Sequence, residues 1–430
     1  MSELYGALGA MIEDLPDVPP AILMLISELA KSVSPTDARK RVRGMLRELR
    51  DQSEIFIDGN IGRTGYSKDP LSFDVHLHGA LDVLSGSGCA EISCRVKTAD
   101  QIVRSVGLFA DKIWITDHFS YMFLDFGRAT NAKIEIILDE FFVLSRLLPL
   151  ILSGIVRFRS PWIPTCSNCL NDFEARITRA TQDVAQEFIN DFGIEHSIDN
   201  EYIIDTGNCF DPPIIFRGEF SNAPLAKEVA ESTIYNELRS AFFVAREAAF
   251  SGGSLFSNSR IGMAGLMRSE GRMFDRQSLL KMDKEREFQI PWVSELNATQ
   301  IIQLRQEASS ALPAFREKMA RMLGPNGSPG SSQDEIINEL REQAVEVRNE
   351  LKINQKNSGK YWKTGFGILG LGVSAYGATH GEVAAGIGGL LPIIQLMIDH
   401  KKDHSAGVSK LISQPSYVLV KAQDILTHAH

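Results

Sequence analysis

The spacing of apolar positions divides the chain into a helical beginning, a mixed middle and a helical end. Residues 21–26 form an apolar run behind two prolines, and residues 36–51 follow residues that can cap a helix, so both stretches predict helices. From residue 54 the pattern changes to short apolar runs broken by glycine, which is typical of strands. The pattern therefore predicts an α+β fold with a helical N-terminal subdomain at 1–52.

The middle region, residues 53–323, is predicted to mix strands and helices. Thr98 can cap a helix that Gly107 ends, which gives a strand, helix, strand unit with the runs on either side. Residues 251–291 show no clear period, and we interpret them as a loop-rich lid or a domain joint. The predicted strands cover 55–57, 73–77, 90–95, 112–116, 201–204 and 214–217, and further helices are predicted over 174–192 and 225–249.

Residues 134–156 are strongly apolar but contain Arg146 and Pro149 near their middle. A charge near the centre of a bilayer is costly, so this stretch is interpreted as a buried core helix rather than a membrane span. A later helical pattern over residues 301–322 contains Pro313, which should kink it.

Residues 324–332 read GPNGSPGSS, which is typical of a flexible linker, and the main domain boundary is predicted there. The region behind the linker, 333–430, is predicted to be all-helical. It opens with an amphipathic stretch at 334–354, which predicts a helix that needs a partner.

A long, glycine-rich apolar segment lies near the C-terminus at 364–398, and Glu382 is its only charged residue. Glu382 lies in a short polar break, so the segment predicts a helical hairpin. Each half of about 16 residues would be roughly 24 Å long as a helix, against a hydrocarbon thickness of about 30 Å. Small residues allow two helices to approach closely. The hairpin glycines are Gly365, Gly367, Gly370, Gly372, Gly377, Gly386, Gly388 and Gly389.

Two surroundings for this hairpin remain open. Lys360 and Lys363 precede it and Lys401 and Lys402 follow it, so it can enter a membrane from the cytosolic face with both ends inside. Alternatively, it packs within a helical bundle or at the interface of a homo-oligomer or a partner protein. Residues 365–370 also match GxGxxG, but a dinucleotide site needs a strand before the first glycine, and the residues there make a poor strand.

Composition and charge narrow the classes of function. The net charge of the 430-residue chain is −9, which disfavours nonspecific binding to nucleic acid. Five cysteines are an odd number and do not resemble a disulfide framework, so a reducing cytoplasm is the expected setting. No secretory signal is evident at the N-terminus.

Four residues form the strongest candidate for a metal site. His76 and His78 alternate along a predicted strand and therefore point to one face, and Asp117 and His118 follow the next strand. Such residue types can hold zinc or manganese and activate water for hydrolysis. No GxSxG or GxxxxGK[ST] motif is present, and no other catalytic residue is predicted.

The motifs DVHLH at 74–78 and TDH at 116–118 resemble the opening of a PHP-type metal phosphoesterase. That resemblance covers residues 73–118 and implies metal-dependent phosphoester hydrolysis with His76, His78, Asp117 and His118 near the metal. The chain then departs from the family pattern, because the further histidines of that family should follow, whereas the next histidine is His196.

A second candidate site is the CxxC motif formed by Cys166 and Cys169. This spacing supplies half of a zinc site or a thiol redox pair. No second CxxC or HxxxH motif completes a zinc site, although Cys89, Cys94 or Cys209 can converge with it in space.

Taken together, these patterns favour a non-enzymatic cytosolic sensor, effector or interaction protein, whose C-terminal hairpin mediates oligomerisation or membrane association at the inner face. Bacterial host defence would suit that layout. The alternative hypothesis is a PHP-like metal-dependent hydrolase built on His76, His78, Asp117 and His118.

Overall fold

The computed structural model describes most of the chain. The described residues are 15–60, 72–85, 88–124, 130–160, 165–196, 201–207, 213–218, 223–268, 279–281, 290, 292–323, 333–358 and 410–428. The predicted linker at 324–332, the hairpin at 364–398 with all eight of its glycines, and Cys209 lie outside the described residues. None of the helices within the described ranges is both long and apolar enough to cross a membrane.

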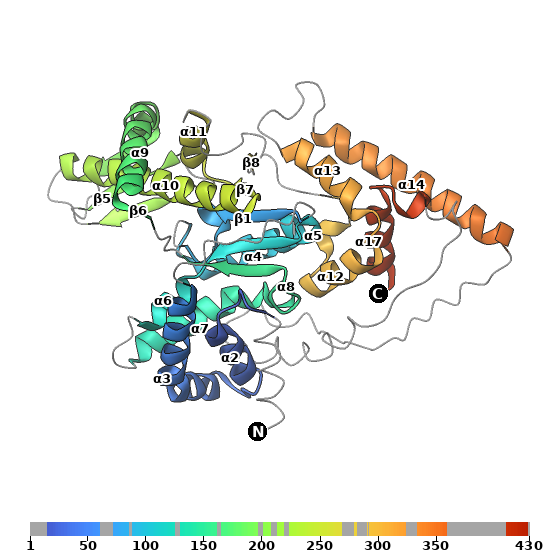
Figure 1. The fold of residues 1–430 in the computed structure, drawn as a ribbon, viewed down its shortest axis with the longest axis horizontal. Coiled ribbons are helices and arrows are strands. Elements are labelled where there is room, and N and C mark those ends of the chain that lie inside the picture. The colour runs from blue at the N-terminus through green and yellow to red at the C-terminus, as the bar shows by residue number, and fades with distance from the viewer. Residues whose placement is uncertain are drawn as a thin grey trace.

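A five-stranded parallel sheet, sheet A, organises the molecule (Figure 1). Its strand order is β3-β2-β1-β7-β8, so the chain adds strands on one side of β1 and then crosses to add them on the other. The strands are β1 (Asp74–His78), β2 (Lys112–Thr116), β3 (Val156–Arg159), β7 (Ser254–Ser257) and β8 (Leu279–Lys281). The predicted α+β class and the predicted strands at 73–77 and 112–116 are confirmed.

The central strand β1 is buried on both faces, as parallel strands usually are. Val75 and Leu77 enter one apolar core, whereas His76 and His78 lie on the opposite face. The same alternation occurs in the neighbouring β7, where Phe256 belongs to the first core and Leu255 to a second one.

The first core also contains the N-terminal helices and the crossovers between β1 and β3. These are α2 (Pro20–Leu29), α3 (Pro35–Asn60), η1 (Gly79–Leu81), α4 (Ile92–Arg104), α5 (Val106–Phe109), α6 (His118–Leu124), α7 (Asn131–Ser145) and α8 (Leu148–Leu152). Helix α3 passes through the boundary predicted at 52, and it packs against α6 and α7.

Two predicted strands are wrong because helical periodicity continues through them. Residues 55–57 belong to α3, where Leu49, Ser53 and Ile57 are buried at a spacing of four. Residues 92–95 belong to α4, so the helix predicted from Thr98 starts one and a half turns earlier.

The apolar stretch 134–156 is buried core, as predicted, but it is not one helix. Helix α7 ends before Arg146, which forms an ion pair with Asp100, and the short α8 follows. Gly154, with a φ of 72°, then turns the chain into β3.

A second apolar core lies over the other face of sheet A. It is built by α9 (Ser167–Phe188), η2 (Ile189–Asp191), α10 (Ala223–Ser251), α11 (Arg260–Arg268) and an antiparallel sheet of β4 (Gly193–His196), β5 (Tyr202–Asp205) and β6 (Ile215–Gly218). The predicted strands at 201–204 and 214–217 and both predicted long helices are confirmed. The stretch 251–291, predicted to be loop-rich, instead contains β7, α11 and β8.

The C-terminal helices pack at the end of sheet A where β2 begins (Figure 1). They are η6 (Val293–Glu295), α12 (Ala298–Glu307), α13 (Leu312–Leu323), α14 (Gln333–Ser358) and α17 (Tyr417–His428). Pro313 lies at the start of α13 and so separates two helices rather than kinking one. Helices α14 and α17 contact each other, which gives the amphipathic stretch at 334–354 a partner.

Candidate functional site

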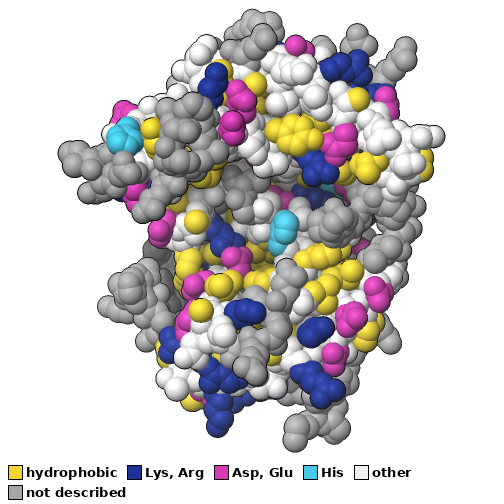
Figure 2. Space-filling model, turned by 90° about the vertical axis from the view of Figure 1, so that its left-hand side faces the viewer, with side chains coloured by type: hydrophobic (Ala, Val, Ile, Leu, Met, Phe, Trp, Pro, Cys, Tyr) yellow, Lys and Arg dark blue, Asp and Glu magenta, His cyan; other side chains and the backbone are white. Residues whose placement is uncertain are grey.

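The strand order of sheet A reverses between β1 and β7, and the chain leaves their carboxyl ends in divergent directions. In open parallel sheets such a point forms a crevice in which ligands bind. We call the two turns there, residues 78–80 and 257–260, the switch-point site. Figure 2 shows the molecule from one side, with a hollow across its middle that is bordered by charged side chains and a histidine side chain.

The two turns of the switch-point site lie against each other. Gly79 follows β1 with a φ of 71°, a conformation that suits glycine. A Cβ atom at Gly79 would come within 2.7 Å of Asn258 Oδ1, so this position also has no space for a side chain. The backbone of the turn after β1 is therefore held close to the turn after β7.

The turn after β7 caps helix α11. Ser259 donates its N–H to Ser257 Oγ at 3.1 Å, and its own Oγ accepts the N–H of Gly262 at 3.0 Å. Arg260, the first residue of α11, is half-buried, and its Nε has no hydrogen-bond partner among the described residues. A guanidinium group thus lies at the N-terminal, electropositive end of a helix.

His78 lies directly beneath α11. Its Nδ1 hydrogen-bonds Ser257 Oγ at 2.9 Å, and its Nε2 lies 3.5 Å from Oε1 of Glu237 on α10. Burial, with a smaller effect of Arg159, lowers the pKa of His78 to about 3. Burial also raises the pKa of Glu237 to about 7, against the opposing effect of a hydrogen bond with Ser259. Ser259 therefore connects the cap of α11 to this buried pair.

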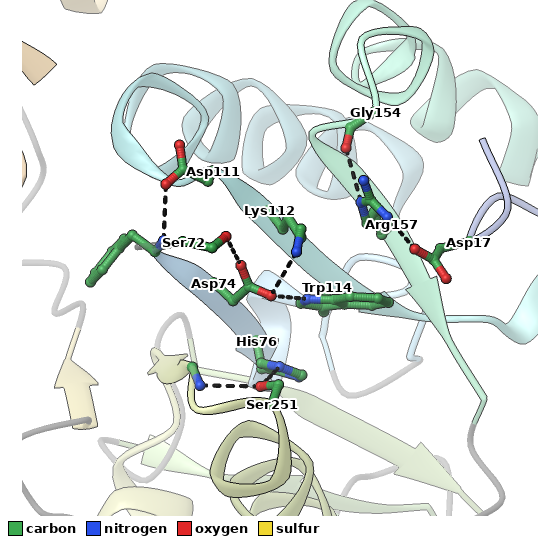
Figure 3. A network of polar contacts seen from close by, with 12 residues as sticks. Asp17, Ser72, Asp74, His76, Asp111, Lys112, Trp114, Gly154, Arg157 and Ser251 are labelled. Atoms are coloured by element: carbon green, nitrogen blue, oxygen red, sulfur yellow. Dashed lines mark hydrogen bonds and ion pairs between the residues drawn. The ribbon is translucent and has the colours of Figure 1, made fainter. Parts of the chain in front are cut away.

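His76 points to the same face of β1 as His78, as predicted, but it is held by other groups (Figure 3). Its Nε2 hydrogen-bonds Ser251 Oγ at 2.8 Å, and its ring stacks on Trp114 with 5.9 Å between centroids. Trp114 Nε1 in turn donates to Asp74, which also lies 3.7 Å from Lys112 Nζ. Burial lowers the pKa of His76 well below its usual value.

Asp117 and His118 lie at the carboxyl end of β2. The Asp117 carboxylate accepts the N–H of Ser120 at 2.9 Å and so caps α6. Burial raises the pKa of Asp117 to about 6. His118 is half-buried, and burial lowers its pKa.

The predicted metal ligands thus come from the neighbouring strands β1 and β2 and from the turn after β2, but three of the four have other roles there. Both histidines hydrogen-bond serines, and Asp117 caps a helix. Within the described part of the chain, no group of three or more His, Cys, Asp or Glu side chains is arranged to hold a metal ion.

A buried ion pair that the sequence pattern did not reveal joins the ends of β1, β2 and β3. Arg159 donates to Asp82 at 2.7 Å and to the carbonyl oxygens of Leu77 at 2.6 Å and Trp114 at 2.7 Å. Asp82 also accepts the N–H and the hydroxyl of Thr116. No local motif connects Asp82 with Arg159, because the two are brought together only by the sheet.

The CxxC motif lies elsewhere, at the start of α9. Cys166 is the N-cap residue, and its Sγ accepts the N–H of Cys169 at 3.5 Å. Both thiols are exposed. The Cys169 N–H, helped by the Cys169 thiol, lowers the pKa of Cys166, while the hydrogen bond with Cys166 raises the pKa of Cys169. These two cysteines are therefore chemically unequal.

Comparison of the chain with known protein families, curated proteins and solved structures finds no match.

Proposed function

We propose that this protein is a sensor that binds a small anionic ligand, of the phosphate or nucleotide class, at the switch-point site. The observation that carries the proposal is the position of Arg260 at the N-terminus of α11, beside the reversal of strand order between β1 and β7. Ligands of parallel sheets bind outside the carboxyl ends of the strands at such a reversal.

Charge favours an anion at this place. Arginine at the first position of a helix is opposed by the positive end of the helix dipole. A bound anion would be stabilised by both the guanidinium group and the positive end of the helix dipole. Arg260 Nε is buried and has no hydrogen-bond partner among the described residues, so one donor of this guanidinium group is unsatisfied.

The surroundings of Arg260 are compatible with an anion. The buried carboxyl group beside His78 belongs to Glu237, and its pKa of about 7 means that it is largely uncharged below neutral pH. His78 beside it is uncharged above its pKa of about 3.

The C-terminal helices supply a candidate output for such a sensor. They pack at the other end of sheet A, where Arg305 Nη1 donates to the carbonyl oxygens of Gly107, Leu108 and Ala110. A rigid connection therefore runs from the sheet to α12. The segment proposed to act on a membrane or an oligomer interface, 364–398, follows α14 in the chain.

Ligand binding to the purified full-length protein tests this proposal. Isothermal titration calorimetry with inorganic phosphate, pyrophosphate, ATP and NAD should give saturable binding of at least one of them. Arg260→Ala should weaken that binding at least about tenfold, because it removes a charge-assisted contact worth about 1.5–3 kcal/mol.

The matched control is Arg268→Ala, at the last position of the same helix, where Arg268 pairs with Glu187 on the surface. Its affinity should stay within about twofold of the wild type, since surface pairs contribute little. Equal weakening by both variants, or no binding of any of the four anions, would refute an anion site at Arg260.

A further inference from the structure

The CxxC motif is independent of the switch-point site, and its geometry supports a chemistry of its own. Cys166 and Cys169 are three residues apart across the first turn of a 22-residue helix, with both side chains exposed. Cys166 is the N-cap residue, with φ −67° and ψ 154°, and its side chain reaches toward Cys169, the third residue of the helix. A modest change in the conformation of the cap would bring the Cβ atoms of the two cysteines to the separation of about 3.5–4.5 Å that a disulfide needs.

The cap of α9 already holds the two sulfur-bearing residues together. Cys166 Sγ accepts the Cys169 N–H at 3.5 Å, so this sulfur lies over the N-terminal end of the helix, which stabilises a thiolate. The preceding residue, Thr165, accepts a hydrogen bond from Arg246 on α10 at 2.8 Å. The turn is thereby tied to the second core, and Arg246 brings a positive charge near the pair.

We propose that Cys166 and Cys169 form a redox-active dithiol that exchanges with low-molecular-weight disulfides. Cys166 is the attacking residue, because its sulfur is exposed and stabilised as a thiolate. Cys169 is the resolving residue, because it is the neighbouring thiol on the same turn.

The exchange proceeds in two steps. The Cys166 thiolate attacks one sulfur of the disulfide, which forms a mixed disulfide and releases the other half as a thiolate that takes up a proton. Cys169 then loses its proton and attacks Cys166 Sγ, which forms the Cys166–Cys169 disulfide and releases the second half as a thiol. Two electrons pass from the protein dithiol to the small disulfide, and one disulfide yields two small thiols.

Cys89 and Cys94 provide an internal comparison. These free cysteines are half-buried, and burial raises the pKa of Cys94, with a further contribution from its hydrogen bond with Cys89. Cys94 is the third residue of α4 rather than its N-cap, and its own N–H donates to the carbonyl oxygen of Glu91 at 3.1 Å. We therefore expect this pair to react more slowly with the same disulfide.

The experiment incubates the reduced full-length protein with mixtures of reduced and oxidised glutathione, quenches with acid, alkylates free thiols and maps the products by peptide mass spectrometry. The expected product is the Cys166–Cys169 disulfide. Cys89 and Cys94 should stay reduced during the incubation and should therefore be recovered as alkylated thiols. Cys169→Ser should accumulate glutathione on Cys166, since the resolving thiol is absent. Cys166→Ser should react at least about tenfold more slowly at Cys169.

Two results would overturn the proposal. One is a wild-type protein in which Cys166 and Cys169 stay reduced under oxidising glutathione while Cys89 and Cys94 react. The other is equal glutathione labelling of Cys166 and Cys169 in the two serine variants, which would mean that the cap of α9 does not activate Cys166. Because both cysteines are exposed, the serine substitutions should leave the fold intact, and circular dichroism of each variant checks this.

Discussion

His78 Nε2 and Glu237 Oε1 face each other at 3.5 Å in the buried interior beneath α11. Their pKa values of about 3 and about 7 mean that both side chains are uncharged between these limits, so the contact is not an ion pair in that range. Above pH 7 the carboxyl group loses its proton next to a neutral imidazole. The pair is therefore a proton-dependent element in the centre of the fold.

The first prediction concerns the pH dependence that Glu237 causes. Burial raises its pKa from 4.5 to about 7, so the folded state binds this proton more tightly than the unfolded state. The resulting stability is fully present below pH 4.5 and is lost as the pH rises through 7, a change of about 3 kcal/mol at most. Glu237→Gln should remove this loss.

Urea unfolding of the wild type and Glu237→Gln at pH 5 and pH 8 measures how much free energy of unfolding each protein loses between the two pH values. His78 is present in both proteins, so its opposite contribution cancels in the comparison. Glu187→Gln, a change at the surface, should retain the wild-type pH dependence. The prediction would be contradicted if the free energy of unfolding changed with pH by the same amount in the wild type and in Glu237→Gln.

A second prediction concerns the ion pair between Asp82 and Arg159, whose side chains are each only 2% exposed. Asp82→Ala leaves a guanidinium group buried without its counter-charge, so it should lower the free energy of unfolding by about 3–5 kcal/mol. Asp100→Ala breaks the more exposed pair with Arg146 and should cost about 1 kcal/mol or less. Chemical denaturation compares the two variants, and equal losses would show that burial is not the deciding factor.

A third prediction concerns the attachment of α12. Arg305 is half-buried against three carbonyl oxygens of α5 and the turn that follows it, and desolvation, together with the nearby Arg316, lowers its pKa to about 10. Arg305→Ala should destabilise the protein by about 2–4 kcal/mol, because these acceptors lose a charged donor. In this variant, amide hydrogen exchange should become faster in α12, with a smaller increase in β1. Arg47→Ala, whose side chain is 95% exposed, should change stability by less than about 0.5 kcal/mol.

A fourth prediction concerns the apolar segment 364–398. If it enters membranes, the full-length protein should float with liposomes of phosphatidylcholine and phosphatidylglycerol, and deletion of the segment should abolish flotation. The deletion variant should keep the thermal unfolding transition of the region before residue 324. Full-length protein that stays in the unbound fraction would favour a role for the segment at an oligomer interface instead. Light scattering of the same sample measures the size of that oligomer.

A fifth prediction separates the sensor from a metal-dependent hydrolase. The hydrolase hypothesis requires stoichiometric zinc or manganese that is lost in the His76→Ala, His78→Ala double variant. Because Ser251 and Ser257 already hydrogen-bond these histidines, we expect elemental analysis to find well below one metal ion per chain. A full complement of metal in the wild type would overturn that expectation.

Local patterning determined a substantial part of this fold. The alternation in DVHLH placed His76 and His78 on one face of a strand, and β1 has that arrangement. The run 112–116 and the long helices α9 and α10 were equally predictable. Short elements such as β7 were missed, because four residues, SLFS, carry too little periodicity to distinguish a strand from a loop.

Tertiary structure alone decided what surrounds those residues. Strand order is set by long-range pairing, so the sequence could not show that β7 would lie beside β1 and bring Ser257 to His78. Asp82 and Arg159, which are 77 residues apart, meet for the same reason. The sequence thus determined which face each side chain occupies, through the local geometry of strand and helix. Packing determined the neighbours of that side chain, and therefore its charge state and its chemistry.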